Sequence, residues 1–287
     1  MIMPTNYTLT VRGRRLIQEL RRAREEAGFT QAQVAEEMGW SESKQIKFER
    51  GVQPAKVSDV RAMLSLYKVT DEVAETLVRL AKDATRKGWW HSHGDVIPQW
   101  FEVFIGLETE ATEIRNYQSE LIPGLFQTPD YHRAYLRAAL LDDGDEAEME
   151  RTIEIRRQRQ TRLEASDAPA YWAILNEAAI RRFSDTEVAR RQLKFLLDRA
   201  ELPSVTFQIL PFSAGMHAAQ HLAPFVILGF PESADLDVVY IESQHGSLYL
   251  EEKAHVTRYN DVFNHLRAKA YDSDQSQALI AQAIREV

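Results

Sequence analysis

Three glycines, each placed just after a short helical pattern, constrain the first third of this chain more than any other feature. Gly28, Gly39 and Gly51 follow segments in which apolar residues recur at intervals of three and four. A glycine at such a place typically ends a helix, because it readily adopts the left-handed conformation that other residues avoid. Thr30 and Ser41 stand where the next helices would begin, and their hydroxyls are suited to cap them. The pattern predicts a compact bundle of short helices joined by tight turns.

Five helices are expected in this segment. The second begins after Thr30, and Gln33 three residues later completes a capping-box pattern. That helix has only about two turns, so it needs packing against its neighbours to be stable. The third begins after Ser41; Ile46, Phe48 and Glu49 are expected to face inward, which leaves a polar outer face. The ranges expected for the third, fourth and fifth helices are Glu42–Arg50, Val57–Tyr67 and Asp71–Ala84.

Residues 12–82 resemble the lambda-repressor-like DNA-binding domain of the XRE/Cro type. The matching residues are Arg24-x-x-Ala27-Gly28-Phe29-Thr30-Gln31-x-x-Val34-Ala35, Gly39-Trp40-Ser41-x-Ser43-Lys44 and Phe48-Glu49-Arg50-Gly51. The resemblance implies that the third helix enters the major groove of duplex DNA. Gln45 departs from the family pattern, in which an apolar residue is usual at this position.

The resemblance and the chemistry of the side chains together predict the DNA contacts. Gln31 would meet a phosphate at a helix N-terminus, Glu42 would accept from cytosine N4, and Arg50 and Lys56 would hold phosphates. The predicted DNA-binding residues are Gln31, Ser41, Glu42, Ser43, Lys44, Lys47, Arg50 and Lys56. The alternative is that the Ser-Lys pair is simply a solvated surface and that Glu49 and Arg50 form a structural ion pair.

Charge and composition limit the partners of the rest of the chain. The 287 residues carry a net charge of −8, divided into +4 over residues 1–87 and −12 over residues 88–287, so DNA is expected to contact only the N-terminal part. The chain has no cysteine, which excludes disulfides and cysteine-based zinc sites. No apolar run of about eighteen residues and no secretory signal is present, so we expect a cytoplasmic protein without a membrane partner.

We predict a mainly α, α+β chain in three parts: a helix-turn-helix domain over 1–87, a linker over 88–99, and an α+β regulatory and dimerisation domain with a small sheet over 100–287. The linker contains His91 and His93, but two histidines without a third ligand nearby do not indicate a metal site. We therefore predict no metal.

Further elements follow from periodicity in the larger domain. Helices are expected over Trp100–Tyr117, from Thr128 or Pro129 to about Leu141, and over Arg151–Ala165, 187–200, Ala254–Ala270 and Gln275–Glu286. Strands are expected over Ala170–Leu175, Val205–Leu210, Ala223–Phe230, Val238–Glu242 and Leu248–Leu250. Arginines at 156, 157, 159 and 162 lie in a stretch that also carries glutamates at 148, 150, 154 and 164. This mixture favours a salt-bridged surface helix over a second nucleic-acid site.

Several stretches of the larger domain form a characteristic pattern: Tyr117-x-x-x-Leu121-Ile122-Pro123-Gly124-Leu125-Phe126-Gln127-Thr128-x-x-Tyr131, Leu175-Asn176-Glu177-Ala178-Ala179, Leu210-Pro211-Phe212-x-Ala214-Gly215, Pro224-Phe225 and Val239-Tyr240-Ile241-Glu242. By these stretches the domain is similar to a domain of unknown function that accompanies Cro-type domains in many actinomycete regulators, often encoded beside a small partner protein. The resemblance implies a regulator and no particular ligand.

No motif for catalysis is found: the domain lacks a nucleophile elbow, a phosphate-binding glycine loop and an H-E-x-x-H sequence. We therefore predict no enzyme and no cofactor. Glu177 is expected to accept backbone amides at a helix start. His217 and His221 are spaced for a helical metal pair, but the surrounding residues favour a loop. A sensing pocket is predicted from Tyr117, Phe126, Trp172, Phe212, His217 and Phe225, with ordinary core packing as the alternative.

We predict that the protein is a dimeric, sequence-specific transcription regulator, and we expect it to act as a repressor. Its partners would be a double-stranded DNA operator, a second copy of the chain, and a small-molecule effector or small partner protein. Dimerisation follows from the physics of DNA binding, since one small module contacts few base pairs. The alternative is an antitoxin-like or anti-activator protein that binds a small partner protein and regulates its own operon.

Overall fold

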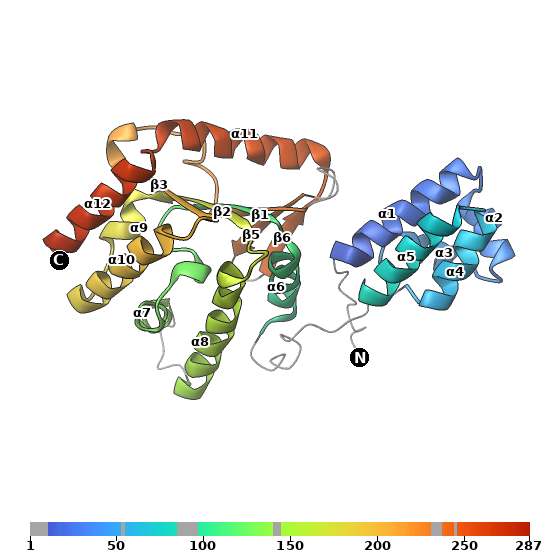
Figure 1. Cartoon of the computed structure of the whole chain (residues 1–287), viewed down its shortest axis with the longest axis horizontal. Coiled ribbons are helices and arrows are strands. Elements are labelled where there is room, and N and C mark those ends of the chain that lie inside the picture. The colour runs from blue at the N-terminus through green and yellow to red at the C-terminus, as the bar shows by residue number, and fades with distance from the viewer. Residues whose placement is uncertain (1–10, 53–54, 85–96, 140–144, 231–236, 244–245) are drawn as a thin grey trace. The chain divides into compact units, whose positions relative to one another are not determined.

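The computed structural model describes residues 11–52, 55–84, 97–139, 145–230, 237–243 and 246–287. The chain divides into two compact units, Met1–His91 and Ser92–Val287, each with its own core (Figure 1). This division falls within residues 88–99, the predicted linker. The two histidines of the linker, His91 and His93, lie outside the described residues.

The described part of the first unit consists of five helices, as predicted: α1 (Val11–Glu26), α2 (Gln31–Glu37), α3 (Glu42–Glu49), α4 (Val57–Leu66) and α5 (Asp71–Ala84). Apolar residues at intervals of three and four meet in one core. Its largest members include Leu16, Leu20, Phe48, Met63, Leu64 and Leu77. Each such side chain contributes on the order of 1.5–3 kcal/mol through burial, which offsets the low stability of these short helices in isolation.

Local capping holds the turns of this unit as the sequence predicts. Thr30 Oγ1 accepts from the backbone N–H of Gln33 at 3.2 Å, and Gln33 Oε1 accepts from the N–H of Thr30 at 2.8 Å. Ser41 Oγ accepts from the N–H of Lys44 at 3.2 Å, which caps α3. The three turn glycines have positive φ angles: 76° at Gly28, 63° at Gly39 and 68° at Gly51. These features confirm the predicted starts and stops of α2 and α3.

A six-stranded mixed sheet forms the centre of the second unit, in the order β3-β2-β1-β4-β5-β6. The strands are β1 (Glu113–Gln118), β2 (Ala170–Asn176), β3 (Val205–Leu210), β4 (Phe225–Gly229), β5 (Val238–Ser243) and β6 (Gly246–Leu250). β1, β2 and β3 are parallel, whereas β4, β5 and β6 continue the sheet from β1 in antiparallel order. The chain as a whole is mainly α within an α+β class, as predicted.

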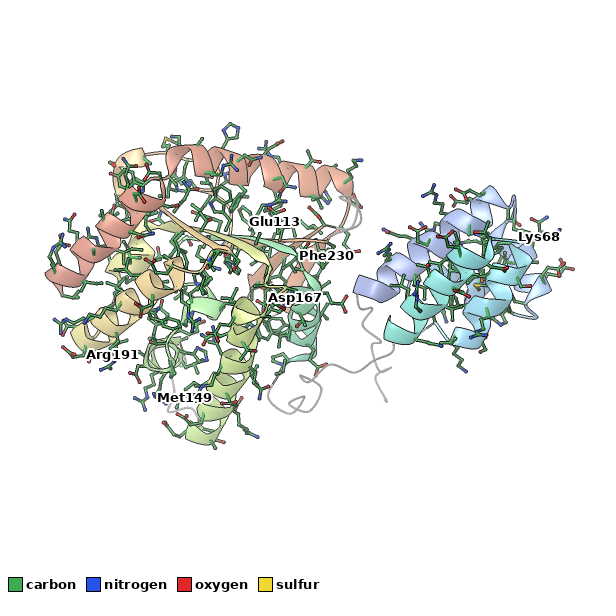
Figure 2. The ribbon with its side chains drawn as sticks, in the orientation of Figure 1. Lys68, Glu113, Met149, Asp167, Arg191 and Phe230 are labelled. Atoms are coloured by element: carbon green, nitrogen blue, oxygen red, sulfur yellow. The ribbon has the colours of Figure 1, made fainter. Side chains whose placement is uncertain are left out.

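Helices cover both faces of this sheet. α11 (Lys253–Lys269) lies along one face, while α6 (Gln99–Glu110), α8 (Glu146–Gln160) and α10 (Thr186–Ala200) lie on the other (Figure 1). Side chains fill the space between the sheet and these helices (Figure 2). The remaining elements are η2 (Gly124–Phe126), α7 (Pro129–Ala139), η3 (Thr161–Glu164), α9 (Glu177–Arg181), η4 (Phe212–Ala214) and α12 (Ser273–Glu286).

The edge strand β3 is covered by the start of α12 and the residues before it. The N–H of Ile209 donates to Ser276 Oγ at 2.9 Å, and the carbonyl of Ile209 accepts from the N–H of Tyr271 at 2.9 Å. The backbone N–H and carbonyl of Ile209 are thereby both hydrogen-bonded to groups outside the sheet. An edge covered in this way does not offer those groups to another strand.

The helix predicted over Trp100–Tyr117 is wrong in its second half. α6 ends at Glu110, Ala111 is extended (φ −64°, ψ 140°), and residues 113–118 form β1. Ile114 and Tyr117 are both buried although they lie on opposite faces of the strand. Because helices cover both faces of the sheet, apolar residues need not alternate, and their spacing of three imitates a helix.

The helix predicted over Arg151–Ala165 has different ends. α8 begins at Glu146, where the side chain of Asp145 accepts from the N–H of Ala147, and it continues as η3 to Glu164. Glu146 and Glu148, which lie before the predicted start at Arg151, are therefore in the first turn, at the positive end of the helix dipole. None of the helices in the described ranges is long and apolar enough to cross a membrane.

Candidate nucleic-acid interface

The outer face of α3 is polar and exposed. Ser41, Glu42, Ser43 and Lys47 are all exposed at or near its N-terminal half. Lys44 is partly buried, and its Nζ lies 3.5 Å from the centroid of the Trp40 ring. A cation over an indole face is attracted to it, so the ring restrains the lysine close to the start of the helix.

Trp40 also connects this surface to the core. Its ring centroid lies 5.6 Å from that of Phe48, a buried residue on the inner face of α3. The same aromatic side chain therefore contacts the core below and the Lys44 ammonium above. The position of Lys44 thus depends on the packing of the helix beneath it.

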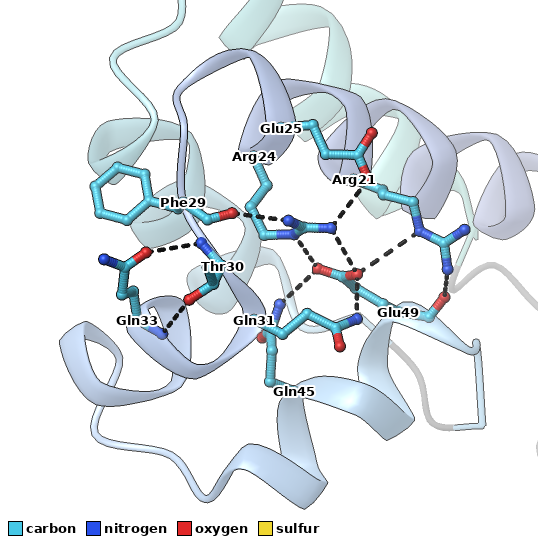
Figure 3. Close-up of polar contacts among 9 residues, drawn as sticks. All are labelled: Arg21, Arg24, Glu25, Phe29, Thr30, Gln31, Gln33, Gln45 and Glu49. Atoms are coloured by element: carbon cyan, nitrogen blue, oxygen red, sulfur yellow. Dashed lines mark hydrogen bonds and ion pairs between the residues drawn. The ribbon is translucent and has the colours of Figure 1, made fainter.

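The inner face of α3 carries a polar cluster, the Glu49 cluster, made of Arg24, Gln31, Gln45 and Glu49 (Figure 3). Glu49 Oε1 accepts from Arg24 Nε at 2.7 Å and from Gln45 Nε2 at 2.9 Å. Glu49 Oε2 accepts from Gln31 Nε2 at 2.6 Å and from Arg24 Nη2 at 3.3 Å. Three helices, α1, α2 and α3, meet at this one carboxylate.

Arg24 extends the cluster to the turn before α2. Its Nη1 donates to the carbonyl of Phe29 at 2.7 Å and its Nη2 to Glu25 Oε1 at 3.1 Å. Arg21 adds an ion pair with Glu49, with Nε and Oε2 3.6 Å apart. Because the guanidinium has its donors in a rigid plane, these bonds hold the end of α1, the turn and α3 in one arrangement.

The charges of this cluster stabilise each other. Burial would raise the pKa of Glu49, but hydrogen bonds from Arg24, Gln31 and Gln45 and the charge of Arg24 outweigh it, so the pKa is lowered. Burial would lower the pKa of Arg24, and the hydrogen bond and charge of Glu49 reverse that effect and raise the pKa. Both groups are therefore ionised at neutral pH.

This arrangement corrects two expectations about α3. Glu49 pairs with Arg24 and Arg21 and not with its neighbour Arg50, which is exposed. Gln45 is fully buried, whereas Ile46 is only partly so. The departure of Gln45 from the apolar pattern has a physical reason, since its amide supplies one of the four hydrogen bonds to Glu49.

The remaining predicted DNA-contacting residues are placed as follows. Gln31 is partly buried, and its side-chain amide is bonded to Glu49. Arg50 forms the C-cap of α3 and Lys56 the N-cap of α4, and both are exposed. The structure brings Ser41, Glu42, Ser43, Lys44 and Lys47 together on α3 and its cap. Contact of any of these residues with DNA stays a prediction.

The six aromatic and histidine residues predicted for a sensing pocket do not converge at one place. Tyr117 contacts both Phe225 and His217, and Tyr117 and Phe225 belong to the core on the face of the sheet that α11 covers. Phe126 contacts Tyr171, and the next residue of β2 points to the opposite face. That next residue is Trp172, which lies on the α11 side, where its Nε1 donates to Gln208 Oε1 at 2.9 Å. Phe212 is 62% exposed.

Two other predictions concern polar residues of the second unit. The sequence predicts that Glu177 accepts backbone N–H groups at the start of its own helix, but its Oε2 accepts from the backbone N–H of Phe212 in η4. Its Oε1 accepts from Arg181 Nε. His217 and His221 lie in a loop, as expected. Within the part of the chain that the structure describes, no group of three or more His, Cys, Asp or Glu residues is arranged to hold a metal ion.

The prediction of a surface helix is wrong for two of the four arginines in α8 and η3. Arg157 is exposed and pairs with Glu154, as expected of a surface residue, and Arg162 is partly buried but pairs with the exposed Asp167. The other two, Arg156 and Arg159, face inward. Arg159 is 7% exposed and forms a bidentate ion pair with Glu108 of α6, in which both N···O distances are 2.8 Å.

A sequence signal for the inward arginines exists in hindsight. They lie seven and ten residues after Met149, on the helix face that carries Thr152 and Ile155. This face starts with apolar residues and ends with arginines. The helix is therefore recognised as amphipathic along its whole length only if these arginines are assumed to be buried. Their carboxylate partner in α6 is far away in the sequence, so the spacing alone does not identify it.

Comparison with known proteins agrees with this division into two units. Residues 15–77 match a helix-turn-helix domain, and residues 101–282 match the family described as a domain of unknown function, DUF5753. No curated protein and no solved structure matches the chain. The second match covers more than half of the chain. The chain therefore belongs to the DUF5753 family, with a helix-turn-helix domain in its N-terminal unit.

Proposed function

We propose that this protein is a dimeric, sequence-specific transcription regulator of the cytoplasm. The observation that carries the proposal is the polar face of α3, on which Glu42, Ser43 and Lys47 are exposed. A helix of this size fits the major groove, and residues near its N-terminus reach the base edges. The match to a helix-turn-helix domain supports the same use of this surface.

In this proposal the Glu49 cluster fixes α3 relative to α1 and α2. DNA recognition needs side chains held in place before binding, because ordering them on the DNA would cost affinity. Lys44 over Trp40 is one such restrained group. Arg50 and Lys56 would add phosphate contacts that do not depend on sequence.

The second unit would supply dimerisation and the regulatory input. Two copies double the contacts with DNA, over half-sites about one helical turn apart. An input signal can change operator affinity only if it favours one of two arrangements of the DNA-binding units. Light scattering on the full chain and on a fragment of residues 97–287 tests the dimer; a monomeric fragment would assign the contact to the first unit.

The decisive experiment is on α3. Genomic footprinting of the bound protein first identifies the operator. Lys44→Ala with Lys47→Ala should then weaken specific binding by roughly a hundredfold in a gel-shift assay at fixed salt, as expected for the loss of two contacts. The matched control is Lys194→Ala with Arg285→Ala, which removes the same charge from exposed positions in the second unit. Equal loss in the two variants would refute the assignment of α3.

A further inference from the structure

A cavity of about 260 Å³ lies in the second unit between the start of α6, α7, α8 and β5. We call it the arginine cavity. Trp100, Phe101 and Leu136 form much of its apolar wall, while Arg156, Arg159 and His132 supply its basic groups. The volume is near the lower limit of small-molecule sites, which are typically about 300–1,000 Å³. A ligand of one or two rings is the size that fits.

The two arginines of the cavity differ in their partners. Arg159 is already paired, because its Nε and Nη2 donate hydrogen bonds to Glu108. Its guanidinium also lies 5.1 Å from the centroid of the Phe101 ring. Arg156 has no hydrogen bond or ion pair with any residue in the described ranges, and its Nε is enclosed without a partner. The residue as a whole is partly buried. An enclosed guanidinium nitrogen without an acceptor is costly, so an acceptor from outside the chain would stabilise it.

The charge of Arg156 persists in the folded protein. Burial and then the neighbouring Arg159 lower its pKa to about 9, so it remains a cation at neutral pH. Glu242 also lines the cavity, but this residue is exposed and accepts from the hydroxyl of Tyr240 at 3.1 Å. The enclosed part of the cavity is therefore positive.

His132 provides a second unpaired group of opposite character. Its Nε2 lies 3.2 Å from Thr152 Oγ1, which itself donates to the carbonyl of Met149 at 2.8 Å. The hydroxyl has only one proton, so His132 Nε2–H must be the donor between them and Nδ1 carries a lone pair. Nδ1 is enclosed and has no partner among the described residues, and the side chain is nearly fully buried.

We propose that the arginine cavity binds a small aromatic carboxylate that carries a hydroxyl or amine on its ring. The carboxylate would pair with Arg156, whose planar donors match two oxygens; the ring would lie against Trp100 and Leu136; and the hydroxyl or amine would donate to His132 Nδ1. The single free guanidinium suits a monoanion better than a phosphate, which needs more donors. As the input of the regulator, this site rests on the function proposed above.

Binding is tested on the full chain by isothermal titration calorimetry. The probes are benzoate, its 2-, 3- and 4-hydroxy derivatives, benzamide and inorganic phosphate. We expect at least one hydroxybenzoate to bind more tightly than benzoate, and benzamide and phosphate to bind at least tenfold more weakly than that hydroxybenzoate. Equal binding of benzamide, preference for phosphate, or no binding of any probe would overturn the proposal.

Variants then assign the contacts. Arg156→Gln should weaken the best probe at least tenfold, whereas Arg157→Gln, one residue away and exposed, should leave it unchanged. Gly124→Ala is an independent second variant, because a Cβ there would lie 2.5 Å from Arg156 Nη1 and would displace the guanidinium while keeping the arginine. His132→Phe should remove the preference for the hydroxyl. Unchanged affinity in both Arg156→Gln and Gly124→Ala would refute the site.

The role of the site as an input is measured separately from DNA binding itself. Operator affinity is determined with and without the best probe, in the unmodified chain and in Arg156→Gln. A probe-dependent change of at least threefold, lost in Arg156→Gln, supports the input. Binding of the probe without any change in operator affinity overturns the input and leaves the site; loss of operator binding in the Lys44 and Lys47 variant alone concerns only the function of α3.

Discussion

The two units each bury arginine side chains, but they treat the charge in opposite ways. In the Glu49 cluster, Arg24 meets a carboxylate that accepts four hydrogen bonds from three side chains. In the arginine cavity, Arg156 has no acceptor among the described residues, and the Nδ1 of His132 has no donor. A charge paired within the chain serves the fold, whereas a charge left unpaired beside a cavity is available to a ligand. Substitution and pH should therefore affect the two regions differently.

The largest effect is expected from breaking the cluster in the first unit. Glu49→Ala leaves the largely buried guanidinium of Arg24 without its carboxylate, and loss of one partner of a buried ion pair typically costs about 3–5 kcal/mol. We expect the free energy of unfolding of the first unit to fall by that amount. Hydrogen exchange of α1 and α3 amides measures it, with amides of α10 as an internal control.

Acid should affect the second unit first. Burial, followed by the charges of Arg156, Arg159 and Arg133, lowers the pKa of His132 from 6.5 to about 3. As the pH falls, His132 is therefore protonated in the unfolded chain at a higher pH than in the folded chain. The stability that the neutral histidine contributes to the folded state is complete above pH 6.5 and is lost as the pH falls toward 3. The slope is at most roughly 1.4 kcal/mol per pH unit. Urea unfolding between pH 7 and 4 should show it, and His132→Phe should flatten it.

In the first unit the corresponding loss should begin at lower pH. The folded-state pKa of Glu49 lies below its usual value of 4.5, so its stabilising contribution is complete above that pH and declines only as the pH drops further. If acid unfolding began at the same pH in both units, and His132→Phe left that pH unchanged, the two units would not differ in their response to acid.

A smaller effect of opposite sign is expected at Arg156. Arg156→Met replaces an unpaired cation by an apolar chain of similar length, which removes a desolvation cost without breaking an ion pair. The free energy of unfolding of the second unit should stay the same or rise, by up to about 2 kcal/mol. A loss like that of Glu49→Ala would show that Arg156 has a structural partner after all.

The smallest effect is expected at Gln45. Gln45→Leu restores the apolar residue usual at this position and removes one hydrogen bond to Glu49, while Oε1 of the glutamine has no partner among the described residues to lose. The gain and loss nearly cancel, so a change of less than about 1.5 kcal/mol is expected. Thermal unfolding measures it. A larger loss would mean that the cluster depends on every one of its bonds.

Much of the first unit was predictable because its signals are local. Thr30 and Gln33 cap α2 with atoms three residues apart, and Gly28 ends α1 by its own φ angle. The partner of Glu49 was not predictable in the same way. Arg50 is next to it in the sequence, but consecutive residues of a helix point in different directions, and Arg24 is brought close only when α1 packs against α3.

The second unit shows the limit more sharply. The sequence of β1 predicts the end of a helix, because a sheet covered on both faces hides the alternation that identifies a strand. The glutamates of the same stretch predict a surface position for Arg156 and Arg159. The ion pair of Arg159 is instead made with Glu108, fifty-one positions earlier.

The amino-acid sequence by itself determined where the short helices of the first unit start and stop, because caps and glycine turns act over three or four residues. The tertiary structure alone decided which charges find partners, because a side chain can be buried against another only after distant helices have packed. Arg24 and Arg156 are the same residue type on similar helices, and only packing gives one a carboxylate and leaves the other beside an open cavity.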